Sequence, residues 1–264
     1  MTKPDLKPNP KLGEGTATPE EMAYRSALIY NLSAIYEPIK ATISDGTPSL
    51  AKLDKISKYI ENFITQNQRE ADLQPHKFFY SAVLDANKKL HKVNPQLPQI
   101  APDYSKLNPI QGQQHNNCDT IGQYLKGRIS QALMIYDIQT QAAAKKKKKT
   151  PEEDLDDTVD SAFQESRNRL DLMGLSGYVE ANRAGHLSTY VAAGLLMGEI
   201  VYVEWVSAGD DHVCDECDDL ESNSPYSAND YPATPHAGCR CEPGEITIGM
   251  VNEAGDFVIL HLYY

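Results

Sequence analysis

Cys214-Asp-Glu-Cys217 and, 18 residues later, His236-Ala-Gly-Cys239-Arg-Cys241 are the stretches that decide the fold of the C-terminal third of this chain. Two cysteines separated by two residues present their thiolates on one side of a tight bend, at the separation that a tetrahedral zinc ion requires. The second stretch can supply the remaining two ligands. We therefore predict one zinc site that is built from both stretches.

Five side chains in these stretches compete for four ligand positions. Cys214, Cys217 and Cys239 are the firmest candidates, and the fourth ligand is His236 or Cys241. On a strand, Cys239 and Cys241 would share a face and both could bind; in a turn, His236 is the better partner of Cys239, and we favour it slightly. Reduced cysteines without a metal, or a pair of disulfides, are the alternatives.

The number and spacing of the cysteines favour metal over disulfides. Four of the five cysteines lie between Cys214 and Cys241, whereas a secreted disulfide framework has an even and more widely spread set. The start, Met1 to Gly15, has no apolar leader, and the most apolar stretch, Tyr190 to Met197, is far shorter than the roughly 20 residues of a membrane span. We expect a soluble, unexported protein with no membrane partner.

Charge and motifs narrow the class of function. The formal net charge of -12 excludes bulk attraction to DNA. No histidine is followed by x-Glu or belongs to an H-E-x-x-H motif, and no P-loop or nucleophile elbow is present. Because a catalytic zinc needs an open position and a base, we predict a structural Zn²⁺ and no enzyme activity.

Zinc also has a physical task here. The segment from Ser207 to Glu242 has little apolar content and cannot close a core alone, whereas zinc ligation contributes on the order of 10 kcal/mol. Residues 200–206 read as a strand, and 245–248 and 257–260 as two more. Trp205, the only tryptophan, is predicted to anchor the core beside the site.

The rest of the chain reads as helices. Thr18-Pro-Glu-Glu21 is a helix-start signal for a run that Pro38 ends, and helices follow over 49–66 and 75–92. Further helices are expected over 119–144, from 150 to about 172, and over 178–197. Gly174 and Gly177 are expected to break the last two apart.

The expected fold is mainly α, with an extended helical N-terminal region and a small C-terminal α+β module stabilised by zinc. The predicted regions are a flexible arm (1–17), a helical region (18–93), a proline-rich connection (94–115), long helices with a lysine-rich turn (116–177) and the zinc-binding module (178–264). The run Lys145–Lys149 reads first as a solvated helix end, and alternatively as a contact to DNA phosphates.

The C-terminal pattern resembles the minor head proteins of tailed phages, the Mu F-like head-morphogenesis family. The likeness rests on Trp205, Gly209-Asp210, Leu220 and the two cysteine stretches, which follow a helix and a strand in the family's order, over residues 178–245. Of the Arg-Thr-Glu-like element in the family's preceding helix, only Arg183 is present. The family's proline after the motif histidine is replaced by Ala237.

This resemblance implies a structural virion component, located at the head or portal and in the host cytoplasm during assembly. It implies the portal or major capsid protein as partner, a multimeric state in the virion, and a role in head assembly or DNA packaging and delivery. Packaged DNA is a further possible partner through Lys145–Lys149. The alternatives are a zinc-ribbon protein that binds nucleic acid, or an effector enzyme delivered with the DNA.

Overall fold

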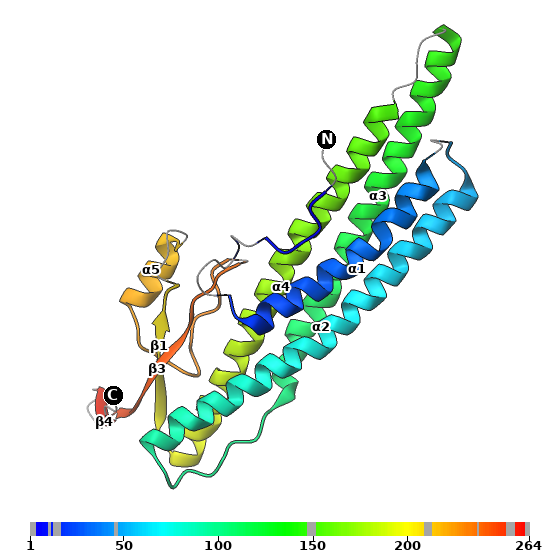
Figure 1. Ribbon diagram of the computed structural model, residues 1–264. Coiled ribbons are helices and arrows are strands. Elements are labelled where there is room, and N and C mark those ends of the chain that lie inside the picture. The colour runs from blue at the N-terminus through cyan, green and yellow to red at the C-terminus, as the bar shows by residue number, and fades with distance from the viewer. Residues whose placement is uncertain are drawn as a thin grey trace. The chain divides into compact units, whose positions relative to one another are not determined.

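The protein is mainly helical, with a small antiparallel sheet near the C-terminus, as the sequence predicts (Figure 1). The computed structural model describes residues 4–9, 12, 17–44, 47–146, 152–208, 213–236, 238–251 and 257–261. Four long helices account for most of the chain: α1 (Pro19–Ile43), α2 (Leu50–Val93), α3 (Asn108–Lys146) and α4 (Glu152–Met197).

The chain divides into two compact units. Unit 1 comprises Met1–Ala71 and Gln113–Gly174, and unit 2 comprises Asp72–Gly112 and Leu175–Tyr264. Each unit is therefore made from two separate stretches, whereas the sequence analysis expects consecutive regions. The unit boundaries fall inside α2, α3 and α4, each of which continues across its boundary without a break.

In unit 1, α1 packs with the first part of α2, most of α3 and the first half of α4. Thr18 caps α1, as predicted, because its hydroxyl accepts a hydrogen bond from the backbone of Glu21 at 3.1 Å. The core consists of aliphatic and aromatic side chains from all four helices, among them Leu28, Leu32, Phe63, Leu125 and Phe163.

Two prolines that were expected to lie at helix ends, Pro38 at the end of one helix and Pro75 at the start of another, lie inside helices. α1 continues through Pro38 to Ile43. α2 continues through Pro75, so the two predicted helices 49–66 and 75–92 form one helix. A proline inside a helix costs about 3 kcal/mol. Ile39 and Ile43 are fully buried beyond Pro38, and burying each contributes roughly 1.5–3 kcal/mol, so packing outweighs the local cost.

The helix α4 does not break at Gly174 and Gly177. A Cβ atom at Gly174 would lie 2.8 Å from Cγ of Arg25, whose guanidinium is buried in an ion pair with Asp171. Gly174 therefore allows α1 and α4 to approach closely, and its presence reflects packing rather than a helix end. The helix ends instead at Met197, directly before Gly198, which has a φ of 71°.

The proline-rich connection is shorter and more ordered than predicted. It contains a short 3₁₀ helix, η1 (Tyr104–Leu107), and α3 begins at Asn108, because Pro109 suits a first helical turn. Leu97 and Ile100 are buried, and the side-chain amide of Asn87 bonds both the N–H and the carbonyl of Ile100. Buried contacts that the composition does not reveal thus hold this segment on α2.

Part of the predicted flexible arm, 1–17, is hydrogen-bonded to unit 1. The N–H of Asn9 donates to Asp171, and Arg25 donates to the carbonyls of Asn9 and Leu12. These contacts supply partners for backbone groups in a segment that has no secondary structure of its own. Residues 1–3, 10–11 and 13–16 of the arm lie outside the described residues.

Unit 2 contains the sheet. Strands β1 (Ile200–Val206), β2 (Tyr226–Ser227), β3 (Glu242–Val251) and β4 (Phe257–His261) form an antiparallel sheet of order β2-β1-β3-β4. Side chains of β1 and β3 pack on Ala86 and Leu90 of α2 and on Tyr190 and Ala193 of α4. This contact holds β1 in place, and Trp205 near the end of β1 packs with the cysteines of the site.

No helix in the described part of the chain is long and apolar enough to cross a membrane. The helix α3 extends to Lys146, and Lys147–Lys149 of the predicted lysine run lie outside the described residues, as do Gly209, Asp210 and Ala237 of the resemblance.

Candidate metal centre

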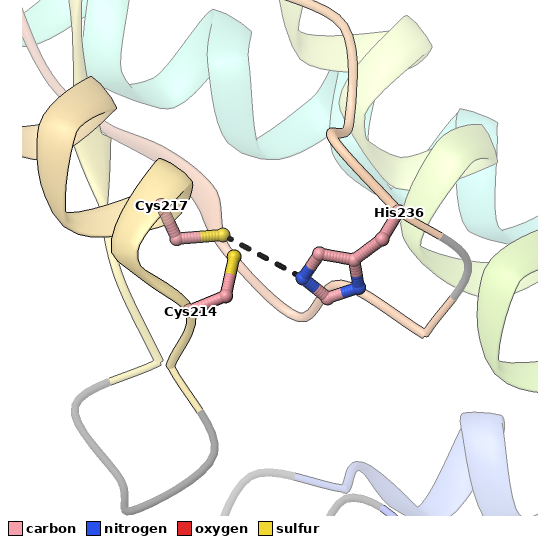
Figure 2. A group of neighbouring side chains, drawn as sticks. All are labelled: Cys214, Cys217 and His236. Atoms are coloured by element: carbon pink, nitrogen blue, oxygen red, sulfur yellow. Dashed lines mark hydrogen bonds between the residues drawn. The ribbon is translucent and has the colours of Figure 1, made fainter.

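The first cysteine pair lies at the start of α5 (Asp215–Ser222), a short helix that the sequence analysis did not predict. Cys214 is the residue before the helix, and its carbonyl accepts hydrogen bonds from the N–H groups of Cys217 and Asp218 at 2.9 and 3.1 Å. Residues three apart on a helical turn lie on the same side. The sulfur atoms of the two residues therefore lie close together, as the spacing predicts, but at the start of a helix rather than in an isolated bend (Figure 2).

The second stretch forms a turn just before β3. The N–H of Cys239 donates to the carbonyl of His236 at 3.2 Å, and Gly238 has a φ of 84°, which only glycine adopts readily. The N–H of Gly238 also donates to the hydroxyl of Ser176 at 3.3 Å, which attaches the turn to α4. Cys241 directly precedes β3, so the sheet positions it.

All five predicted ligands come together. Among the described residues, ligand atoms lie within 4.8 Å of one another in two groups, Cys214–Cys217–His236 and Cys217–Cys239–Cys241. Cys217 belongs to both groups: its Sγ is 3.7 Å from Sγ of Cys239 and 3.9 Å from Nε2 of His236. We call these five residues the Cys–His cluster. Figure 2 shows Cys214, Cys217 and His236 directed at a common point.

The spacing suits a metal ion and not a disulfide. Four ligands around a tetrahedral zinc, with zinc–sulfur bonds of about 2.3 Å, have sulfur–sulfur separations of about 3.8 Å. The separation of 3.7 Å between Cys217 and Cys239 is close to that value. A disulfide needs about 2.05 Å, and the cysteines are free. The cluster can therefore hold a metal ion, and its donor set of thiols and imidazole is the one zinc prefers.

Burial divides the cluster into an inner and an outer part. Cys217, Cys239 and Cys241 are buried, Cys214 is half-buried and His236 is exposed. Both candidates for the fourth position, His236 and Cys241, lie within reach of Cys217.

The thiols influence one another's protonation. Burial raises the pKa of Cys217 to about 12, whereas a hydrogen bond from Cys241 lowers the pKa of Cys239. The pKa of Cys241 is raised, first by its hydrogen bond to Cys239 and then by burial. Thiols that interact this closely titrate as a group, and a cation that binds them must displace their protons.

Aromatic side chains surround the inner thiols. Trp205 is buried with Cys217, Cys239 and Cys241, which confirms its predicted place in the core. Tyr231 stacks on Trp205 with a centroid separation of 5.5 Å, and its hydroxyl donates to the carbonyl of Glu204 at 3.0 Å. These contacts give the segment a small apolar centre.

Two residues beside the cluster were not predicted to belong to it. Tyr231 lies between the two cysteine stretches, and the only signal for it was an aromatic residue in an otherwise polar segment. Arg183 lies in α4, and its guanidinium carbon is 4.8 Å from the ring centroids of both Trp205 and Tyr231. Asp210, Asp211 and His212, which are close to the cluster in sequence, lie outside the described residues.

No family model, curated protein or solved structure matches this chain.

Proposed function

We propose that this chain is a structural minor head protein of a tailed bacteriophage, whose C-terminal module is closed by one zinc ion. The observation that carries the proposal is the Cys–His cluster. Trp205 and the two cysteine stretches, which carry the resemblance to phage minor head proteins, lie together in the order and spacing of that family. Their proximity supports the proposal, because residues of one metal-binding motif must meet in the fold.

The zinc ion in this proposal is structural. A catalytic zinc keeps one position open for water, with three protein ligands, whereas five donors crowd around this site. Cys217 and Cys239 would bridge α5 to the turn before β3, and Cys214 and His236 or Cys241 would complete the tetrahedron. The zinc ion supplies bonds that the small aromatic centre cannot supply alone.

The alternative of a zinc ribbon that binds nucleic acid has less support. Five acidic residues on α5 are exposed beside the cluster, and Arg240 is the one basic residue between Ser207 and Glu242. Binding to a phosphate backbone needs a basic face. No specific observation favours an effector enzyme.

The proposed partners are the portal or major capsid protein, in the virion and earlier in the host cytoplasm, with several copies per particle. Contact with packaged DNA through Lys145–Lys149 is a separate part of the proposal. It applies to the end of α3, which belongs to unit 1, and does not involve the zinc ion.

The test is mass spectrometry of purified virions of the encoding phage, with the wild-type chain and with Cys217→Ser. We expect the wild-type chain in the particle at low copy number, and the variant reduced or absent. Cys118→Ala, which removes the one cysteine outside the cluster, is the matched control and should be incorporated normally. Absence of the wild-type chain from virions and from portal pull-downs would overturn the proposal.

A further inference from the structure

Arg183 is buried in unit 2 with two guanidinium nitrogens unpaired. The residue is 6% exposed, and neither Nη1 nor Nη2 has a hydrogen-bond partner within the described residues. Removing an arginine from water without a compensating anion is strongly unfavourable, so a buried guanidinium is normally paired. This arrangement points to a negative charge that forms beside Arg183 and that the polypeptide alone does not supply.

The position of Arg183 identifies the source of that charge. Its guanidinium lies over Trp205 and Tyr231, at 4.8 Å from each ring centroid, and these rings pack against the thiols of Cys239 and Cys241. Burial lowers the pKa of Arg183, and the hydroxyl of Tyr231, the two thiols and the carboxylate of Glu180 oppose that effect. Arg183 is thus electrostatically coupled to the cluster.

Glu180, one turn before Arg183 on α4, does not supply the missing charge. It forms no ion pair with Arg183 among the described residues, so the two guanidinium nitrogens have no carboxylate partner there. Burial raises the pKa of Glu180, and the charge of Arg183 opposes that effect. The cluster differs, because metal binding fixes its cysteines as thiolates. Zn²⁺ bound to four thiolates leaves a net charge of two negatives, and Zn²⁺ bound to three thiolates and a neutral imidazole leaves one.

We propose that Arg183 is the counter-charge of the zinc–thiolate centre, held beside the sulfurs by the rings of Trp205 and Tyr231. This inference rests on the metal centre of the proposed function. Arg183 is then a positioning and charge-balancing residue, not a ligand. Its charge opposes folding of the metal-free module and favours the metal-bound one, so its removal has opposite effects on the two states.

The experiment uses the full chain carrying Arg183→Met, which keeps much of the side-chain volume and removes the charge. Zinc affinity is measured on reduced, metal-free protein by competition with a chromophoric chelator. Loss of a residue that supports metal ligands typically weakens binding about 10–100-fold, and we expect a loss in that range. The urea midpoint of the metal-free variant should equal or exceed that of the wild type.

Two further variants separate charge from packing. Arg183→Lys keeps the charge, so its zinc affinity should fall less than that of Arg183→Met. Arg169→Met is the matched control: this arginine also lies over a tyrosine ring, that of Tyr124 at 4.0 Å, but it belongs to unit 1. The control should bind zinc as the wild type does.

Each other outcome has a definite meaning. If Arg183→Met binds zinc as tightly as the wild type, whether or not its metal-free form is destabilised, Arg183 is only a packing residue. The inference then fails, and the zinc centre still stands. Equal losses for Arg183→Lys and Arg183→Met also overturn it, because the charge would then be irrelevant. A wild-type chain that binds no zinc overturns the inference and the metal centre together.

Discussion

Cys217 is the residue on which the metal centre depends most. It belongs to both groups of close ligand atoms and is almost completely buried, at 1% exposed. By contrast, His236 and Cys241 each belong to one group and are alternative candidates for one position. The geometry therefore makes Cys217 the central ligand, whereas the sequence spacing alone does not distinguish it from Cys214 or Cys239.

We expect Cys217→Ser to abolish stoichiometric zinc binding, because serine is a poor zinc ligand and no other side chain joins the two groups. In contrast, His236→Ala and Cys241→Ser should differ from each other. The variant that lacks the true fourth ligand loses affinity, and the other binds as the wild type does. Titration of cobalt(II) with absorption spectroscopy reports both affinity and the number of thiolates. Full binding by Cys217→Ser would show that the cluster is not the site.

The raised pKa of Cys217 contributes to the pH dependence of the metal-free protein. Its pKa in the folded chain is about 12, above the ordinary value of 9.0, so the folded state keeps its proton longer than the unfolded state. The contribution to stability is present below pH 9 and is lost as the pH rises towards 12. Zinc binding has the opposite trend, because protons must leave the thiols and affinity increases with pH.

This prediction can be measured by urea unfolding of metal-free protein at pH 8, 9.5 and 11, together with zinc competition at pH 6, 7 and 8. The urea midpoint should fall over the first series, and the zinc affinity should rise over the second. A zinc affinity independent of pH would mean that thiolates are not the ligands.

At the scale of elements, Gly174 shows why a glycine was wrongly interpreted as a break in α4. A glycine in a helix interior is usually unfavourable, so Gly174→Ala would ordinarily stabilise a helix by about 0.5–1 kcal/mol. Here the added Cβ would lie 2.8 Å from Cγ of Arg25, which its ion pair with Asp171 holds in place. Overpacking of this kind costs about 1–3 kcal/mol.

We therefore expect Gly174→Ala to lower the free energy of unfolding of the chain by about 1–3 kcal/mol. Gly127→Ala, in α3 of the same unit, is the matched control, because a Cβ there meets no atom within 4 Å. The control should raise stability by about 0.5–1 kcal/mol. Urea denaturation of the two variants beside the wild type checks both signs, and a stabilising Gly174→Ala would contradict the close packing of α1 on α4.

The elements that the sequence predicted well are those with a strong local signal. The cap at Thr18 and the strand of Ile200–Val206 follow from side chains close together in sequence. The convergence of both cysteine stretches follows from the residue types and spacings that metal binding requires. The continuity of α2 through Pro75, and the burial of Ile100 in the connection, depend on contacts with distant residues. A single sequence shows the local cost of a proline in a helix, but it does not show which distant residues pack there. The free energy gained from that packing outweighs the local cost and cannot be read from the sequence.

The metal site also combines residues that a local sequence pattern identifies with residues that only the fold brings close. Five candidate ligands were identified because metal binding requires particular residue types at particular spacings. Tyr231 and Arg183 were not assigned to it, because aromatic and arginine side chains have many other uses. Only the fold of unit 2 brings Arg183 of α4 beside Trp205 of β1.

For the whole molecule, the division into two units predicts a local effect of zinc. The cluster lies entirely in unit 2, whereas unit 1 has its own core of helices. Adding a chelator should therefore reduce hydrogen-exchange protection in α5 and residues 239–241 and leave α1 unchanged. Hydrogen exchange with mass spectrometry measures both at once, and equal loss of protection in α1 would show that zinc stabilises the chain as a whole.

The most direct test of the account is the zinc content of the full chain, purified under reducing conditions without added metal. We predict one zinc ion per chain, held through gel filtration and lost together with protease resistance of the segment from Ser207 to Glu242 when a strong chelator is added. A metal-free chain whose segment resists protease equally with and without chelator would contradict the central claim.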